Sequence, residues 1–238
     1  MSRIPLVALL CTGLACLACN SQSREARARS SQVAAGPAVP AATGAPGANT
    51  ASADSLLDAA DRGRVLGSET ATVWLLIVSD FQCPFCKQWH DETFASVKRE
   101  YVDAGKIRVA YMNFPLQQHA NSWPSAIAAM CASAQGKFWA TQDRIFTAQK
   151  NWESLPNPTA YLDSLAIASG ADPARQHACT KDRQLRTLID RDQLRMREAG
   201  VQSTPTFFVG SRKIEGAQPA DSFRKVIDSL LRAGRRDK

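Results

Sequence analysis

Cys83 and Cys86, three positions apart, are the residues of this 238-residue chain with the clearest potential for chemistry. They follow an apolar run over residues 73–78 and open an amphipathic segment, so we expect a strand to end and a helix to begin there. A cysteine at a helix N-terminus faces unpaired N–H groups and the positive end of the helix dipole, which favour the thiolate. The i, i+3 spacing brings the second sulfur within disulfide distance. The pair therefore predicts a redox site.

A Cys-x-x-Cys pair also occurs in zinc sites, haem attachment sites and metallochaperones. Haem attachment would need a histidine directly after Cys86, where the chain has Lys87, and a structural zinc site would need a second pair of ligands. Pro84 at the first helical position favours the redox interpretation. We therefore expect no metal and no cofactor, with copper carriage left as an alternative.

The remaining cysteines fall into two groups. Cys11, Cys16 and Cys19 lie near the start of the chain, and Cys131 and Cys179 lie in its second half. Four cysteines lie outside the N-terminal group, and in an oxidising compartment this even number suggests two disulfide bridges. Because the close spacing pairs Cys83 with Cys86, Cys131 and Cys179 form a candidate structural disulfide. The alternative is two buried free thiols.

The N-terminus has the pattern of an export signal over residues 1–19, with Arg3 followed by an apolar run from Ile4 to Ala18. Residues 17–20 resemble the lipobox of bacterial lipoproteins, which makes Cys19 a candidate lipid anchor; ordinary cleavage to a soluble product is the alternative. Residues 20–63 are rich in Ala, Ser, Gly and Pro and predict a disordered linker. These features place the protein in the periplasm or cell envelope, in contact with a membrane only through lipid on Cys19.

The rest of the chain predicts a mixed α/β domain. Strands are expected at 73–79, 107–113, 206–209 and 212–214, a helix from Pro84 to Gly105, a helical insertion at about 118–200, and an amphipathic helix at the C-terminus. A strand, helix, strand order implies a parallel pair with a right-handed crossover. The formal net charge of +7 is mild, and the basic residues alternate with acidic ones along helices, so no nucleic-acid partner is expected.

Several segments resemble, in order, the DsbA-like thiol-disulfide oxidoreductases of the thioredoxin superfamily. They are residues 79–86 (SDFQCPFC), 114–116 (FPL) with His119, Cys131 with 135–139 (QGKFW), and 200–209 (GVQSTPTFFV). The resemblance covers about residues 64–233. It implies an α/β thioredoxin fold with an inserted helical domain.

The resemblance also implies roles for residues around the pair. Thr204 and Pro205 would form a cis peptide facing the two sulfurs, where the backbone pairs with substrate as a short added strand. Phe85 departs from the best-known oxidase of the family, which has histidine between its cysteines, so the thiolate loses a cation and the protein should be less oxidising. Asp80 could relay a proton to Cys86; the alternative is a plain carboxylate at a strand end.

The sequence thus predicts a protein thiol-disulfide oxidoreductase acting on exported proteins, most simply in the oxidising direction. A substrate thiolate would attack an exposed Cys83 sulfur, expel Cys86 and form a mixed disulfide, which a second substrate thiol would resolve. By resemblance, a membrane quinone-linked thiol oxidase would recycle the pair. Run in reverse with a reductase partner, the same chemistry gives a disulfide reductase or isomerase. A binding protein is the alternative of another class, either a copper carrier or a chaperone using the apolar surface around Phe85.

Overall fold

The computed structural model describes residues 48–182 and 184–236 of the chain. The export signal expected at 1–19, the lipid anchor expected at Cys19 and the first part of the expected linker lie outside these residues. Within the described part, no helix has both the length and the apolar composition that crossing a bilayer requires.

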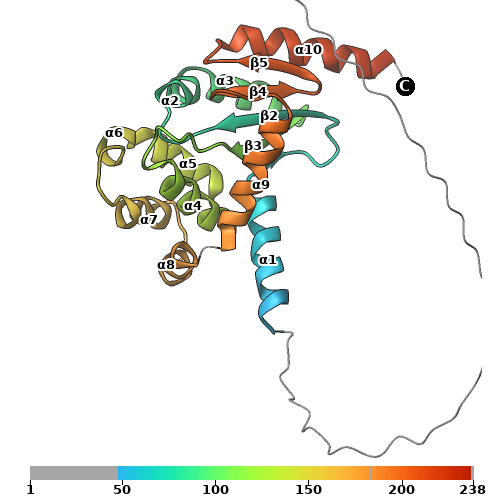
Figure 1. Ribbon diagram of the computed structural model, residues 1–238. Coiled ribbons are helices and arrows are strands. Elements are labelled where there is room, and N and C mark those ends of the chain that lie inside the picture. Colours follow the sequence, from blue (N-terminus) through green and yellow to red (C-terminus); the bar gives the residue numbers. More distant parts are fainter. Residues whose placement is uncertain (1–47, 183, 237–238) are drawn as a thin grey trace, which may run out of the picture. The chain divides into compact units, whose positions relative to one another are not determined.

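A five-stranded sheet forms the centre of the described chain (Figure 1). Its strand order is β1-β3-β2-β4-β5, with β2 and β3 parallel and the other neighbours antiparallel. The strands are β1 (Val65–Gly67), β2 (Val73–Ser79), β3 (Ile107–Asn113), β4 (Thr206–Val209) and β5 (Arg212–Glu215). The sequence predicted β2, β3 and β4 at these bounds and β5 one residue short, but it missed β1. That strand is only three residues long and is defined by its pairing with β3.

The helical segment after β2 carries the cysteine pair at its start. It runs through α2 (Pro84–Trp89), the π-helical turn η1 (His90–Phe94), α3 (Ala95–Val97) and a second π-helical turn η2 (Lys98–Val102). The single helix predicted over this range is therefore interrupted twice by wider turns. The chain leaves the helical segment before Gly105, whose φ of 68° suits a residue without a side chain.

Six helices follow β3 and form the insertion. They are α4 (Ser122–Ser133), α5 (Phe138–Thr147), α6 (Gln149–Trp152), α7 (Thr159–Ala168), α8 (Pro173–Lys181) and α9 (Gln184–Glu198). Figure 1 shows α4 to α8 grouped together, with α9 lying beside α1. The chain then returns to the sheet as β4 and β5, and α10 (Ala220–Arg236) ends the described part.

Helix α1 (Ala48–Gly63) corrects the prediction of a linker over residues 20–63. Leu56 and Leu57 pack against the main core, and Ala60 is fully buried. Arg64, directly after the helix, forms a buried ion pair with Asp192 of α9. The low-complexity composition hid this helix, because its stability comes from tertiary packing against α4 and α9.

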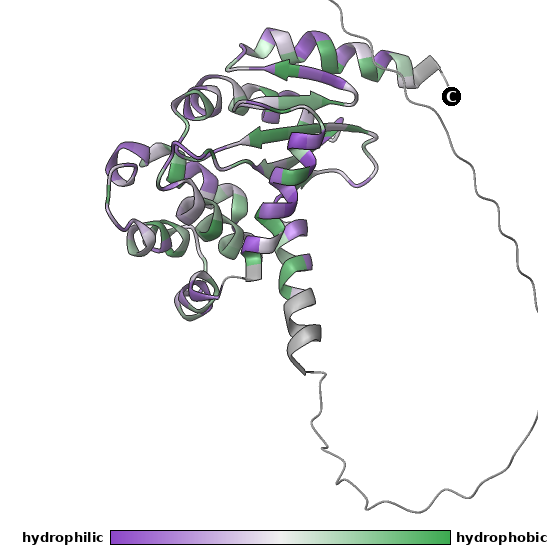
Figure 2. Cartoon of the chain, in the orientation of Figure 1, coloured by the Kyte–Doolittle hydropathy of each residue, from purple (hydrophilic) through white to green (hydrophobic). Residues whose placement is uncertain are grey.

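Aromatic packing fixes the cysteine-bearing helix to the sheet. The ring of Trp89, at the end of α2, lies 4.4 Å from Phe207 of β4 and 5.4 Å from Phe223 of α10. On the loop before the pair, Phe81 stacks on Tyr111 of β3 at 5.0 Å. Figure 2 shows the apolar character of the central strand β2, in contrast to the alternating polar and apolar turns of α10. The active-site segment is thus held by packing on both sides of its cysteines.

Candidate active site around Cys83 and Cys86

Cys83 lies at the point where the loop after β2 becomes helix α2. It is the N-cap residue, with an extended backbone (φ −71°, ψ 122°), and Pro84 takes the first helical position. Its N–H donates to the Asp80 carbonyl at 3.1 Å, and its own carbonyl accepts from the N–H of Lys87 at 3.1 Å. Proline suits this position because the first N–H of a helix has no partner within the helix. The local sequence therefore places the first sulfur at the start of the helix.

The two sulfurs, which are free thiols in the structure, have opposite acid–base behaviour. Hydrogen bonding to Cys86 lowers the pKa of Cys83 to about 6, helped by Thr204 and by the backbone of Cys86 and Phe85 and opposed by burial. Burial raises the pKa of Cys86, and its interaction with Cys83 acts in the same direction. One sulfur is thus stabilised as a thiolate, whereas its partner is held protonated.

Access to Cys83 differs from the expectation of an exposed sulfur. Cys83 is only 3% exposed and Cys86 only 1%. Phe85, between them, is 61% exposed and is one of two large apolar side chains that are exposed in the described part of the chain. The apolar face that the site presents is therefore the Phe85 ring, with the sulfurs beneath the surface.

The peptide bond between Thr204 and Pro205 is cis. The Thr204 carbonyl lies 3.4 Å from the Cys83 sulfur and accepts the hydrogen bond of its thiol. The Pro205 carbonyl accepts from the N–H of Gly216, which follows β5. The structure thus brings this segment to Cys83 across 121 residues of chain.

Asp80 is bound by donors from its own loop after β2 and from the segment after β3. Its buried carboxylate accepts hydrogen bonds from the N–H groups of Gln82 and Leu116 (2.8 and 2.9 Å) and from the Ser122 hydroxyl. His119 lies 2.7 Å away through Nδ1. The carboxylate therefore joins the loop before Cys83 to the chain that enters the insertion.

The backbone of Asp80, rather than its carboxylate, interacts with the Cys86 sulfur, where it partly offsets the rise in the pKa of Cys86. The four contacts of the carboxylate lead to Gln82, Leu116, His119 and Ser122. These contacts support a structural and electrostatic role for the carboxylate at this position.

Gln149 is a site residue that the sequence did not indicate. From α6 of the insertion, its side-chain amide donates to the carbonyls of Phe81 and Cys83, at 2.7 and 3.3 Å. It is only 1% exposed. A lone glutamine on a four-residue helix gives no local signal, because its partners lie 66 and 68 residues earlier in the chain.

Comparison with known proteins agrees with this geometry. The model of a family described as thioredoxin matches residues 59–229. The chain belongs to the thioredoxin family. A probable disulfide bond formation protein D from Bacillus cereus is 25% identical over 173 residues, which cover 70% of this chain and 78% of that protein.

Solved structures share the fold. The oxidised BdbD from Bacillus subtilis has a TM-score of 0.65 and 22% identity, covering 72% of this chain and 94% of that one. Wolbachia pipientis alpha-DsbA1 also has a TM-score of 0.65 and 22% identity, covering 73% and 93%. This thioredoxin-family chain has the α/β fold with an inserted helical region and is DsbA-like. It is a thiol-disulfide oxidoreductase with Cys83 and Cys86 as its Cys-x-x-Cys pair.

The second pair of cysteines in this thioredoxin-family protein lies within the insertion. Cys131 of α4 and Cys179 of α8 form a disulfide, with Cα atoms 5.7 Å apart. Both residues are buried. The structure therefore resolves the alternatives left by the sequence in favour of a bridge between two helices.

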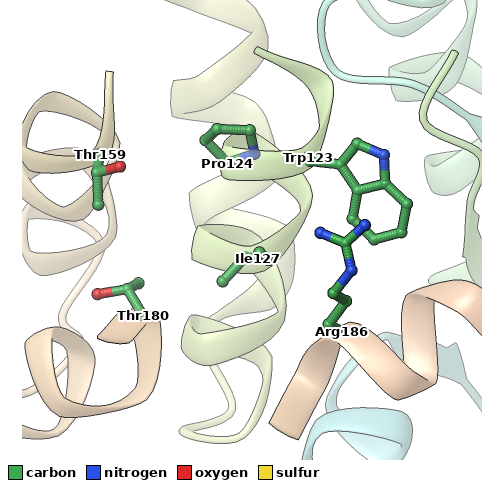
Figure 3. Close-up of a pocket in the computed structure, with 6 residues that line it drawn as sticks. All are labelled: Trp123, Pro124, Ile127, Thr159, Thr180 and Arg186. Atoms are coloured by element: carbon green, nitrogen blue, oxygen red, sulfur yellow. The ribbon is translucent and has the colours of Figure 1, made fainter. Parts of the chain in front are cut away.

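The insertion also contains a cavity of about 270 Å³, which shares no lining residue with the redox site (Figure 3). It is lined by Trp123, Pro124, Ile127, Thr159, Thr180 and Arg186. The Arg186 guanidinium lies over the Trp123 ring at 3.9 Å. None of the lining residues takes part in the hydrogen bonds of Cys83 and Cys86 described above. Among the described residues, no three His, Cys, Asp or Glu side chains are grouped to hold a metal ion.

Proposed function

We propose that this protein oxidises pairs of thiols in exported proteins, with Cys83 as the sulfur that substrate attacks. In the oxidised pair, a substrate thiolate bonds to the Cys83 sulfur and the Cys83–Cys86 bond breaks, so that Cys86 leaves and takes a proton. A second substrate thiolate then attacks the substrate sulfur of the mixed disulfide, and Cys83 leaves as a thiolate. Two electrons pass from substrate to enzyme, which ends as a dithiol.

The observation that carries the oxidising direction is the lowered pKa of Cys83, about 6. A stabilised thiolate is a better leaving group and makes the reduced form of the pair more stable, which raises the reduction potential. The raised pKa of Cys86 supports its role as the group that stays protonated. The two sulfurs thus have separate tasks in the proposed cycle.

We assign substrate docking to Thr204 and Pro205. Their backbone lies at the Cys83 sulfur, where an extended substrate peptide would pair with it as a short added strand. The exposed Phe85 ring offers apolar contact to side chains on either side of a substrate cysteine. Recognition would therefore depend on the substrate backbone and on an apolar neighbour, with little dependence on charge.

The site of action proposed is the periplasm or cell envelope. The export signal at 1–19 supports it, with lipid on Cys19 as the proposed anchor. A periplasmic thioredoxin-like protein from Salmonella enterica has the same fold, with a TM-score of 0.59. A membrane quinone-linked thiol oxidase is the recycling partner that the oxidising direction requires; a reductase would be the partner of the reverse direction.

The equilibrium of the pair with glutathione tests this function. We expect wild-type protein to oxidise a reduced dithiol peptide and to have an equilibrium constant with glutathione that favours the reduced pair. Cys83→Ser should remove the activity while leaving the circular dichroism spectrum unchanged. Unaltered oxidation by this variant would contradict the proposal. A strongly reducing equilibrium would favour the reductase or isomerase, and stoichiometric copper in the purified protein would favour the carrier.

A further inference from the structure

His119 lies on the segment after β3 and contacts the loop that leads to the redox pair, without belonging to the Cys-x-x-Cys segment. Its Nδ1 is 2.7 Å from Asp80 Oδ2, and its side chain is 19% exposed, whereas that of Asp80 is fully buried. The backbone around it is also fixed, since its N–H donates to the Leu116 carbonyl and its carbonyl accepts from Ser122. Asp80 in turn accepts the N–H of Cys83 through its own carbonyl at 3.1 Å. A single residue thus links His119 to the backbone of the attacked cysteine.

The buried Asp80 carboxylate lies on the hydrogen-bonded loop that leads to Cys83, three residues before it in the chain. A carboxylate near a sulfur disfavours the thiolate, because like charges repel strongly where water is excluded. His119 is the basic side chain paired with Asp80 among the described ion pairs. The dipeptide between the cysteines, Pro84 and Phe85, supplies no positive charge.

We propose that His119 is a positioning residue of the redox pair, which as an imidazolium neutralises the buried Asp80 carboxylate and so preserves the Cys83 thiolate. The inference rests on the function proposed above and adds to it the source of the positive charge that Phe85 does not provide. Asp80 and His119 form a neutral pair on the loop that leads to Cys83, held in place by the backbone donors of Gln82 and Leu116.

The electrostatics around His119 agree with this assignment. Its hydrogen bond to Asp80 raises its pKa, the charges of Asp80, Cys83 and Glu153 add to the rise, and burial opposes it. These groups come from the loop after β2, the start of α2 and the residue that follows α6. Glu153 has its own partner in Lys150, at 2.9 Å. Asp80 therefore depends on His119 for compensation, and Glu153 does not.

Alkylation of Cys83 across pH tests the proposal in the full, reduced chain. His119→Asn keeps a hydrogen-bond donor near Asp80 but removes the charge, so the pH midpoint of iodoacetamide reaction should rise by about 0.5 to 1 unit. In Asp80→Asn/His119→Asn the uncompensated carboxylate is also gone, and the midpoint should return towards the wild-type value. His177→Asn, at an exposed histidine on α8, is the matched control and should not move it.

A wild-type midpoint in His119→Asn, or a double variant shifted as far as the single one, would overturn the proposal. A purely structural role for His119 predicts the second result, because the double variant removes more contacts. Failure of the proposed function looks different: the wild-type protein itself would not oxidise a dithiol. If wild-type protein oxidises the dithiol and the pH midpoint of Cys83 alkylation in His119→Asn equals that of wild type, only the present inference fails.

A measurement on wild-type protein avoids any folding defect of the variants. If His119 stabilises the Cys83 thiolate, the thiolate must equally stabilise the imidazolium. The NMR titration of the His119 ring should therefore give a higher pKa in the reduced protein than in the Cys83–Cys86 disulfide form. Equal values in the two forms would contradict the coupling.

Discussion

The two cysteine pairs of this chain have different roles, one reactive and one structural. Cys83 and Cys86 are three residues apart at the start of a helix and are free in the structure, whereas Cys131 and Cys179 are separated by 48 residues and bridge two helices of the insertion. The first pair is surrounded by hydrogen bonds that favour one thiolate. The second closes a long loop between buried positions. The position of a cysteine on its helix, and the length of chain that it closes, therefore separate a reactive pair from a structural one.

Removal of the structural pair should have the largest effect on stability. A loop of 48 residues closed by a disulfide is stabilised by about 4 kcal/mol through the entropy of the unfolded chain. We expect Cys131→Ala/Cys179→Ala to lose about this much free energy of unfolding in urea titrations. Its rate of dithiol oxidation at low temperature should stay near that of wild type. A lost rate with unchanged stability would reverse the roles assigned to the two pairs.

A charge next to the reactive pair should have the next largest effect. Phe85→His places a cation beside Cys83, on a side chain that is 61% exposed and leaves no cavity when replaced. We expect the pKa of Cys83 to fall by up to about one unit, which shifts the equilibrium with glutathione up to about tenfold towards the reduced pair.

Phe85→Leu is the matched control, because it keeps an apolar side chain and adds no charge. Its equilibrium with glutathione should stay within about twofold of wild type. A shift as large as that of Phe85→His would show that the aromatic ring, and not the missing charge, sets the potential.

A further expected effect is a dependence of the free energy of unfolding on pH, which the reactive pair shows and the bridged pair does not. In the folded, reduced protein the pKa of Cys83 is about 6, below its ordinary value of 9.0. The thiolate therefore stabilises the reduced form fully above pH 9, and this contribution declines as the pH falls and is lost through pH 6. In urea titrations between pH 5 and 9, the free energy of unfolding of the reduced form should fall relative to that of the oxidised Cys83–Cys86 form as the pH is lowered. A constant difference would exclude a lowered pKa.

The comparison also shows where local sequence signals suffice. Strand β2 was predicted at its observed bounds because it is a continuous apolar run, and β3 because its residues alternate in character until Phe114 and Pro115 end the strand. The start of α2 was predicted because Pro84 fits only the first turn. The cysteine pair follows from both, so its place at the end of a strand was determined locally.

Other parts of the site depended on contacts distant in the chain. Helix α1 was assigned to a linker because Leu56, Leu57 and Ala60 become a packed face only in the folded chain, where the helix lies against α4 and α9. Gln149 reaches the carbonyls of Phe81 and Cys83 from 68 and 66 residues away. Neither leaves a pattern in its own segment, because hydrogen bonds and burial between distant residues are set by the folded chain.

The sequence by itself determined that two sulfurs would meet at a helix start, since spacing and turn chemistry act within a few residues. Only the tertiary structure decided which groups surround them. The Thr204 carbonyl, the Asp80–His119 pair and the buried environment of Cys86 come from segments far apart in the chain. Because charge and burial act through space, the reactivity of each sulfur is a property of the folded molecule.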